Sequence, residues 1–308
     1  MNILNKIKVF VADAILNYPH YIINSFIYMF SRRTIQINAW VIIKYGNVKK
    51  RNWGDDINVF LLEKITNKKV VVINQSLFHR FAKKINYICI GSILGLYENE
   101  QSIIWGTGFI GYDKKLLCKP YRICSVRGKY TRELLMKLGY ECPPVYGDPA
   151  LLISKFYIPP KKECHAYKIG FILHYVDASN IVVNDYVKKN SDCIIISLSN
   201  YEKWTDVIDK ICSCEFIISS SLHGLIVSDT YGIANVWVRL SEDIVGGNFK
   251  FLDYFSSVDR KEIEPNMITS MSDIDDLYES RNLYKKPCID YDKIMESCPF
   301  IESFSISN

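Results

Sequence analysis

Short apolar runs alternate with helix-like segments along most of this chain, and this alternation restricts the possible folds more than any other feature. Runs such as residues 69–73 and 216–219 are rich in β-branched or aromatic residues and are too short for buried helices, so they predict strands. Strands that alternate with helices across short loops form parallel sheets, so the sequence predicts an α/β protein. The predicted strands are residues 37–44, 69–73, 87–91, 102–105, 122–126, 168–173, 192–198, 216–219 and 235–240, and the predicted helices are 57–66, 129–138, 201–212 and 223–230.

The alternation stops once, near Tyr157, where Pro159-Pro160 and a cluster of charges are typical of a linker. At about 150 residues per domain, a chain of 308 residues predicts two domains. We expect an N-terminal segment over 1–36, an α/β domain over 37–158, and a second α/β domain with an acidic helical tail over 159–308. The predicted architecture is two doubly wound, Rossmann-like domains that face a central cleft, where strand carboxyl ends converge.

The front of the chain is basic and aromatic. Residues 1–51 contain eight basic side chains and one acidic side chain, and residues 15–31 carry no formal charge. A membrane span needs about 20 mostly apolar residues, and this stretch is shorter and contains polar residues. A signal peptide is not evident either. Two interpretations stay open: a helix packed on its own domain, or a membrane-surface contact through residues 15–33. The second would place Tyr21, Phe26, Tyr28 and Phe30 in the interface and Arg32 and Arg33 near anionic headgroups.

The ten cysteines form no C-x-x-C pair, and several lie inside apolar runs such as 87–90. Buried thiols in a reducing compartment explain this pattern better than disulfides, and zinc ligands at short spacing are missing. The balance of 38 basic and 33 acidic residues is too even to indicate nucleic acid. We therefore expect a cytosolic protein without a bound metal.

Polar clusters follow several predicted strands, at the edge where open α/β sheets bind ligands. In the first cluster, Asp55, Asp56 and Asn58 surround a helix start after Gly54, which allows close backbone approach. These carboxylates are suited either to hold sugar hydroxyls or to cap the helix, with Asp55 or Asp56 as the N-cap.

Two further clusters carry an arginine and a carboxylate. Arg127 lies between a predicted strand and a helix, where its guanidinium and the free helix N–H groups suit a phosphate or carboxylate. The alternative is a solvated surface arginine. Asp148, before Pro149, either contributes to the site or braces a turn.

The most informative cluster is Ser219-Ser220-Ser221-Leu222-His223-Gly224, which follows the apolar run 216–218. It brings hydroxyls, a titrating imidazole and helix N–H groups together at a strand-to-helix crossover, so we place His223 in the active site. After Arg239, a double glycine precedes Lys250, which predicts either a mobile loop that delivers a cation to an anion or an exposed lysine on an amphipathic helix.

These clusters, in this order, resemble the polysaccharide pyruvyl transferase family. The resemblance covers residues 37–256, and its specific parts are SSSLHG and GGNFKF. It implies a two-domain protein of the GT-B type. It also implies an enzyme that moves pyruvate from phosphoenolpyruvate onto two hydroxyls of a sugar, making a cyclic ketal in capsule or exopolysaccharide. The other matching features are NWGDD, GTG, VRG followed by Thr131, and GDPALL.

The resemblance also implies residue roles. His223 is the candidate general acid/base, since a pKa of about 6.5 suits proton transfer near neutrality. Many relatives have Arg where Ser221 stands, so Arg239 is expected to take part of the phosphate binding. No metal or cofactor is expected beyond phosphoenolpyruvate as co-substrate, and the acceptor is expected to be lipid-linked at the inner face of the cytoplasmic membrane. The donor-side candidates are Arg127, Lys250, Arg239, Ser220 and Ser221, and the acceptor-side candidates are Asp55, Asp56, Asn58 and Asp148.

Two alternatives remain. A GT-B-type glycosyltransferase would be protected by a nucleotide diphosphate and not by phosphoenolpyruvate. A non-catalytic, membrane-docked partner of the polymer machinery would tolerate His223→Ala but not loss of the segment before Arg33.

Overall fold

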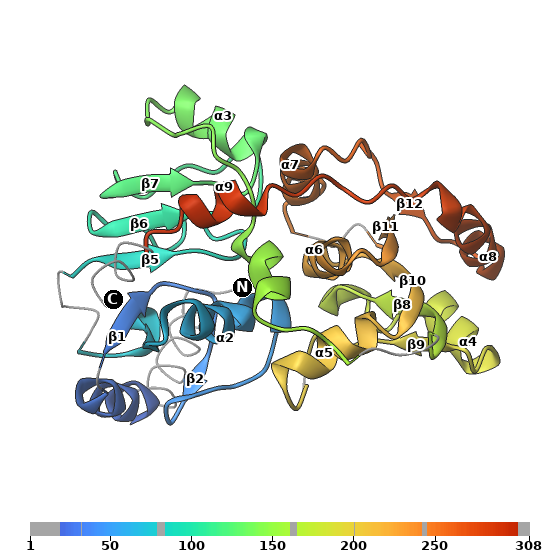
Figure 1. The fold of residues 1–308 in the computed structure, drawn as a ribbon, viewed down its shortest axis with the longest axis horizontal. Coiled ribbons are helices and arrows are strands. Elements are labelled where there is room, and N and C mark those ends of the chain that lie inside the picture. The colour runs from blue at the N-terminus through green and yellow to red at the C-terminus, as the bar shows by residue number, and fades with distance from the viewer. Residues whose placement is uncertain are drawn as a thin grey trace, which may run out of the picture.

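The computed structural model describes residues 19–31, 33–78, 84–160, 165–199, 201–241 and 245–300, and it contains two five-stranded parallel sheets (Figure 1). The first sheet has the strand order β4-β1-β5-β6-β7. Strand β6 is buried at all four residues and β4 at three of its four, which explains why both are mostly apolar runs in the sequence. The strands are β1 (Thr34–Ile37), β4 (Lys69–Val72), β5 (Asn86–Ile88), β6 (Ser102–Trp105) and β7 (Arg122–Ser125).

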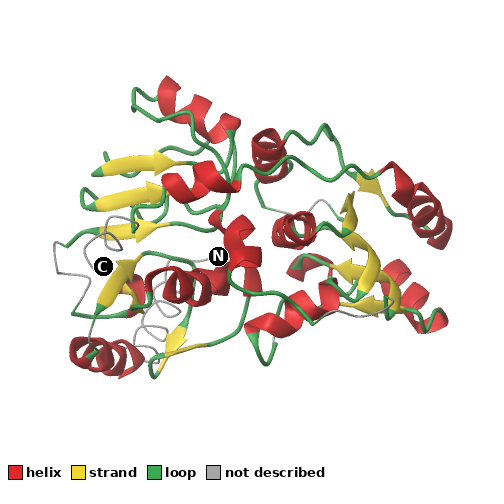
Figure 2. Ribbon diagram, in the orientation of Figure 1, coloured by secondary structure: helices red, strands yellow, loops and turns green. Residues whose placement is uncertain are grey.

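The second sheet has the order β12-β11-β10-β8-β9, and helices lie on both of its sides (Figure 2). The mixed α/β class with parallel sheets, which the alternating pattern predicts, is therefore confirmed. The strands are β8 (Tyr167–Ile172), β9 (Cys193–Ile195), β10 (Cys214–Ser219), β11 (Ala234–Arg239) and β12 (Asn266–Met267).

Helices connect the strands of both sheets, and a small antiparallel hairpin of β2 (Ile43–Lys44) and β3 (Asn47–Val48) follows β1. The α-helices are residues 19–30, α2 (Trp53–Thr66), α3 (Lys129–Lys137), α4 (Ile181–Lys189), α5 (Trp204–Ile211), α6 (Leu222–Tyr231), α7 (Phe249–Val258), α8 (Met271–Glu279) and α9 (Tyr291–Glu296). Short 3-10 helices are η1 (Ile73–Gln75), η3 (Pro149–Lys155), η4 (Tyr175–Asp177) and η5 (Ser280–Leu283).

Two predicted elements near the front of the chain are wrong in their bounds. The strand expected over 37–44 is instead the end of β1 and the start of the hairpin, because Ile43 pairs with Val48 and not with the sheet. The helix expected from Ile57 begins at Trp53. Asn52 is its N-cap, and its side chain accepts a hydrogen bond from the Gly54 N–H at 3.2 Å.

Contacts between side chains and helices connect the half of the molecule around the first sheet to the half around the second. Helix α7 packs against α3, and the Trp53 indole N–H donates to the carbonyl of Trp204 at 2.7 Å. The last described residues return to the first sheet, where the Trp105 indole N–H donates to Ser297 Oγ at 3.1 Å and the Phe300 ring lies 4.5 Å from that of Tyr87. Helix α9 accordingly crosses back in front of β5 and β6 (Figure 1). The predicted domain limits stay a prediction.

None of the nine cysteines within the described residues is in a disulfide, and five of them are buried. Burial raises the pKa of the Cys142 thiol to about 11 and that of Cys193 to about 12, so both are protonated at neutral pH. None of the helices within the described residues combines the length and the apolar character needed to cross a bilayer.

Candidate active site

Charged and polar side chains from both halves meet at the carboxyl ends of the parallel strands. Arg127 follows β7, His174 follows β8, and His223 lies in the first turn of α6, directly after β10. In Figure 1 the arrows of β5, β6 and β7 point from the first sheet toward the second. We use the name inter-sheet cluster for the seven side chains that interact here, directly or electrostatically: Asp55, Arg127, Asp148, His174, Asp177, His223 and Lys250.

His223 lies directly against the backbone of α2. A Cβ atom on Gly54 would stand 2.1 Å from the His223 Nδ1 atom, so only glycine permits this approach. The His223 Nε2 atom is buried and has no hydrogen-bond partner among the described residues. Burial, and then the charges of Arg127 and Lys250, lower the pKa of His223 to about 3. The expectation of an imidazole that titrates near neutrality is therefore wrong for the ligand-free site, where His223 is neutral at pH 7.

Lys250 lies in the first turn of α7 and not on a mobile loop, which corrects one sequence expectation. The other expectation, an exposed helical lysine, is also wrong, because the residue is only 8% exposed. Its ammonium makes no hydrogen bond or ion pair with the described residues. Burial, and then the charge of Arg127, lower the pKa of Lys250 to about 8. A nearly buried ammonium without an acceptor is unusual, because burial of an unpaired charge is costly.

Arg127 is fully buried, so the alternative of a solvated surface arginine is wrong. Its Nε donates to Asp253 Oδ2 at 2.9 Å, Nη2 donates to the Phe109 carbonyl at 2.7 Å, and Nη1 donates to Ser92 Oγ. The Asp253 carboxylate also accepts from the Thr131 N–H and hydroxyl, at 2.8 and 2.7 Å. Arg127 thus joins β7 to α7, and its charge acts on both His223 and Lys250.

Two carboxyl groups of the cluster titrate near neutrality. Burial, followed by repulsion from Asp56, raises the pKa of Asp55 to about 7, although Asp55 is still partly exposed. Burial likewise raises the pKa of Asp148 to about 7. Asp148 Oδ1 accepts the Ala150 N–H at 3.0 Å and caps η3, whereas Oδ2 is buried without a partner in the described part of the chain. Asp148 therefore braces a turn and keeps one oxygen unused.

The other two acceptor-side candidates, Asp56 and Asn58, have internal partners. Asp56 is 2% exposed, and its Oδ2 accepts from the Tyr201 hydroxyl at 3.0 Å and from the Asn52 N–H at 3.3 Å. The Asn58 amide binds the N–H and the carbonyl of Ile90, at 2.9 and 3.0 Å, and joins α2 to the end of β5. These contacts give Asn58 a bracing role, because both N–H groups of its amide donate to backbone carbonyls.

Ser220 of the serine cluster is hydrogen-bonded to Asp177 and His174, two residues that the sequence pattern did not single out. Ser220 Oγ donates to Asp177 Oδ2 at 2.7 Å and accepts the His174 N–H at 2.9 Å, and both Ser220 and Asp177 are buried. Ser221 is the N-cap residue of α6, and its side chain makes no capping hydrogen bond. His174 has an unpartnered buried Nδ1, and burial and Lys250 lower its pKa to about 4. The signal for His174 and Asp177 was available, because they follow β8 as the other clusters follow their strands.

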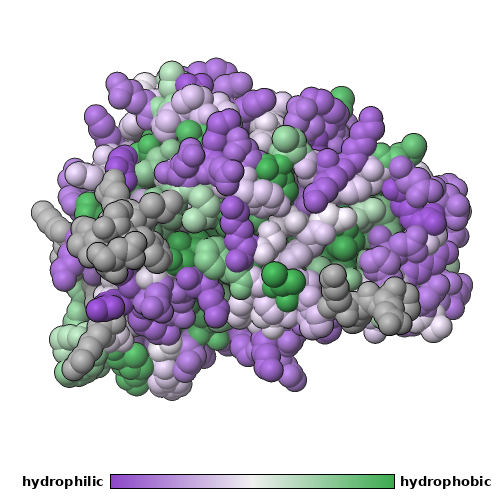
Figure 3. All heavy atoms as spheres, in the orientation of Figure 1, coloured by the Kyte–Doolittle hydropathy of each residue, from purple (hydrophilic) through white to green (hydrophobic). Residues whose placement is uncertain are grey.

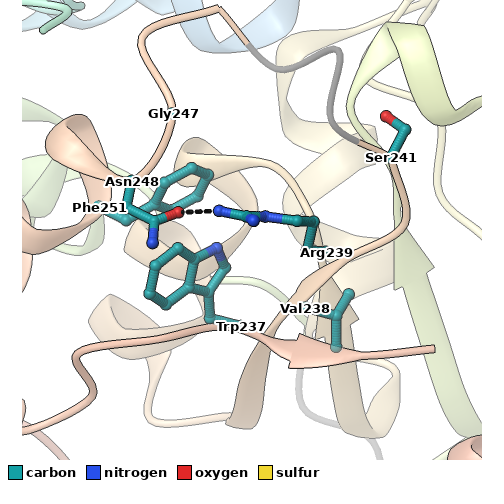
Figure 4. Close-up of a pocket in the computed structure, with 7 residues that line it drawn as sticks. All are labelled: Trp237, Val238, Arg239, Ser241, Gly247, Asn248 and Phe251. Atoms are coloured by element: carbon teal, nitrogen blue, oxygen red, sulfur yellow. Dashed lines mark hydrogen bonds between the residues drawn. The ribbon is translucent and has the colours of Figure 1, made fainter.

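Arg239 lines a small pocket at the end of β11 (Figure 4). Its Nη2 donates to Asn248 Oδ1 at 2.6 Å, and the stacked rings of Trp237 and Phe251 form one wall. Ser241, which also lines the pocket, donates to Asp177 Oδ1 at 2.6 Å. Ser241 therefore connects the pocket to Asp177 of the cluster.

Comparison with known sequences identifies the family. The profile of the polysaccharide pyruvyl transferase family matches residues 5–242. The chain belongs to this family. It is a pyruvyltransferase of polysaccharide biosynthesis, in line with the resemblance of its motifs. The match ends before the Gly246–Lys250 segment, so the cluster position of Lys250 comes from the structure alone.

A similar curated sequence is an uncharacterized protein of Acanthamoeba polyphaga mimivirus. The two are 30% identical over 216 residues, which cover 68% of this chain and 71% of the viral protein. No solved structure matches the chain.

Proposed function

We propose that this pyruvyltransferase takes pyruvate from phosphoenolpyruvate and forms a cyclic ketal on two hydroxyls of a sugar in capsule or exopolysaccharide biosynthesis. The acceptor is carried on a lipid at the inner face of the cytoplasmic membrane. The two parallel sheets would then be the cores of two domains in a GT-B arrangement, with the inter-sheet cluster between donor and acceptor. The observation that carries the proposal is the nearly buried Lys250 ammonium, which makes no hydrogen bond or ion pair with the described residues.

Phosphoenolpyruvate suits this site because it carries two anionic ends, a phosphate and a carboxylate. We assign one end to Lys250, near the charge of Arg127, and the other to the Arg239 pocket, with Ser220 and Ser221 at the start of α6 between them. An anion beside Lys250 compensates a charge that burial otherwise disfavours. The same negative charge raises the pKa of the adjacent His223, so the imidazole becomes able to carry a proton only when the donor is bound.

The proposed reaction balances without a metal or redox partner. His223 gives a proton to the methylene carbon of the donor, and the ketal carbon gains oxocarbenium character. One sugar hydroxyl attacks that carbon and loses its proton, phosphate leaves with its bridging oxygen, and the second hydroxyl closes the ring. Of the two hydroxyl protons, one replaces the proton transferred to carbon and the other leaves on hydrogen phosphate. Arg127 and Lys250 stabilise the departing phosphate.

Asp55 is the acceptor-side residue that the structure favours most for accepting a hydroxyl proton. It is partly exposed, it lies in the same helical turn as Gly54 beneath His223, and its pKa of about 7 suits a base near neutrality. The negative charges of Asp56 and Asp148 raise the pKa of Asp55.

Thermal unfolding with and without millimolar phosphoenolpyruvate tests the proposal. A donor at 100 times its Kd adds about 2.7 kcal/mol of stability, which gives a readable shift in Tm. Lys250→Met should lose the shift, whereas the matched control Lys261→Met, whose side chain is 81% exposed, should keep it. Arg127→Ala is unsuitable as the test variant because it leaves Asp253 buried and unpaired. A shift with a nucleotide diphosphate and none with phosphoenolpyruvate would replace the proposal by a glycosyltransferase.

A further inference from the structure

We infer that the surface formed by helix 19–30 and the β2–β3 hairpin docks on an anionic lipid bilayer. This inference goes beyond the proposed chemistry and does not depend on it, because it rests on two neighbouring surfaces that lie outside the inter-sheet cluster. One is an exposed apolar stripe on the helix, and the other is a basic strip on the hairpin. Residues 15–18 and Arg32, part of the stretch that the sequence suggested for membrane contact, lie outside the described residues.

One side of helix 19–30 fixes it to the first half of the molecule. Asn24 and Ser25 are fully buried and Tyr28 is 2% exposed. The Asn24 amide donates to the carbonyls of Ile43 and Gln75, at 3.1 and 3.0 Å, and accepts the Gly46 N–H at 3.0 Å. The helix is therefore packed on its own half, as the first of the two sequence interpretations expected, and it presents its other side in a fixed orientation.

The other side of the helix is apolar and exposed. Ile23, Phe26, Ile27 and Phe30 are 37, 45, 37 and 78% exposed, and their spacing of three, four and seven residues places them on one stripe. Phe78, itself 45% exposed, extends the stripe through an edge contact with Phe26, with the rings 5.5 Å apart. Hydrophobic atoms are visible at the lower left of the space-filling view, where this helix lies in Figure 1 (Figure 3). A contiguous exposed apolar stripe of this kind indicates an interaction surface.

A basic strip borders the apolar stripe. The hairpin touches the helix at its turn, because a Cβ on Gly46 would lie 3.1 Å from the Ile27 side chain. The segment from 43 to 51 contains four basic residues and no acidic one. Lys44, and to a lesser extent Arg51, lower the pKa of the fully exposed Lys49, which shows that these cations crowd one another. Within the described residues none of these three forms an ion pair.

This combination favours an anionic bilayer over the other possible occupants. An apolar helix face inserts among acyl chains, while neighbouring cations lie at the headgroups, each adding about fivefold to partitioning onto an anionic surface. A second copy of the same surface would bring two sets of uncompensated cations together. A bilayer would also hold the enzyme beside a lipid-linked acceptor, if the acceptor is of that kind.

Vesicle flotation of the full chain tests the inference, with vesicles of phosphatidylcholine alone or mixed with phosphatidylglycerol. We expect binding to the mixed vesicles, loss of binding at high salt, and a decrease of about tenfold or more for Phe26→Ser with Phe30→Ser. Lys44→Glu with Lys49→Glu should weaken binding similarly. The control pair Ile263→Ser with Leu283→Ser removes side chains that are 74 and 79% exposed elsewhere and should bind as the parent does.

Equal binding of parent and Phe26→Ser/Phe30→Ser protein would overturn the inference, and so would the absence of binding to anionic vesicles. A dimer that dissociates in the same double variant would also overturn it, in favour of a contact between copies. The stabilisation by phosphoenolpyruvate is measured on every variant without lipid. Because these substitutions lie outside the inter-sheet cluster, that readout separates a failure of docking from a failure of the proposed chemistry.

Discussion

The affinity of the site for an anionic donor should decrease as Lys250 loses its proton. In the ligand-free protein the pKa of Lys250 is about 8, so the ammonium is charged in most molecules at pH 7 and in about 3% of them at pH 9.5. If phosphoenolpyruvate binds only the charged form, its Kd should rise about 30-fold over this range. A lysine with an ordinary pKa of 10.5 would show little change below pH 10.

Titration calorimetry with phosphoenolpyruvate between pH 7 and pH 9.5 measures this effect. The phosphate of the ligand is about 90% ionised at pH 7 and fully ionised by pH 9, since its second pKa is about 6, so its titration changes the Kd little. Asp55 and Asp148 also lose protons near pH 7 and repel an anion. Lys250→Met removes the ammonium and leaves the Asp148 contribution in place, while the pKa of Asp55 rises because Lys250 no longer lowers it. The 30-fold rise expected of the parent should therefore be absent from the variant.

A parent Kd for phosphoenolpyruvate that stays constant up to pH 9.5 would refute this prediction. Lys250 would then either have a higher pKa than about 8 or make no contact with the ligand. The prediction also fails if Lys250→Met retains the 30-fold rise expected of the parent. Lys261→Met, with its exposed side chain, should reproduce the parent profile and serves as the control for a general loss of positive charge.

Three further substitutions test the neighbouring groups. Gly54→Ala should abolish transfer while the circular dichroism spectrum stays unchanged, because the new methyl group displaces the His223 imidazole. Arg127→Ala should lower the free energy of unfolding in urea by about 3–5 kcal/mol, since it leaves Asp253 buried and unpaired. Burial raises the folded-state pKa of Asp148 to about 7, so the stability it contributes disappears as the pH rises toward 7. Asp148→Asn should therefore raise the free energy of unfolding, relative to the parent, by about 3 kcal/mol more at pH 8 than at pH 5. An equal increase at both pH values would contradict the assigned pKa.

Several strands were predictable because they are short apolar runs buried on both faces of a parallel sheet. Ser102–Trp105 and Lys69–Val72 are examples in which burial alone explains the composition. The run 37–44 failed the same rule, because its apolar residues divide between β1 and a hairpin that packs against helix 19–30. Composition cannot show which of two surfaces an apolar residue will cover.

Several residues of the inter-sheet cluster could be selected from the sequence as site residues, but the side chains they pair with could not. The rule that ligands bind at strand carboxyl ends selected Arg127, Asp148 and His223. It could not show that Asp253, 126 residues away, pairs with Arg127. The Lys250 segment suggested a mobile loop because of its glycines, whereas Phe249 and Phe251, both 1% exposed, fix it as the first turn of a helix.

Burial is the largest cause of all four shifted pKa values that matter for the proposed chemistry. It lowers those of His223 and Lys250 and raises those of Asp55 and Asp148, so in each case the charged form is disfavoured in the empty site. A bound anion favours the protonated forms of His223 and Lys250, the two bases on the donor side, whereas Asp55 belongs to the acceptor side and is assigned the hydroxyl proton. Binding of the proposed donor would therefore draw protons into the cluster at the moment when its methylene carbon needs one. A neutral ligand would leave the empty-site pKa values in place, and the same residues would then lack the proton that the first step requires.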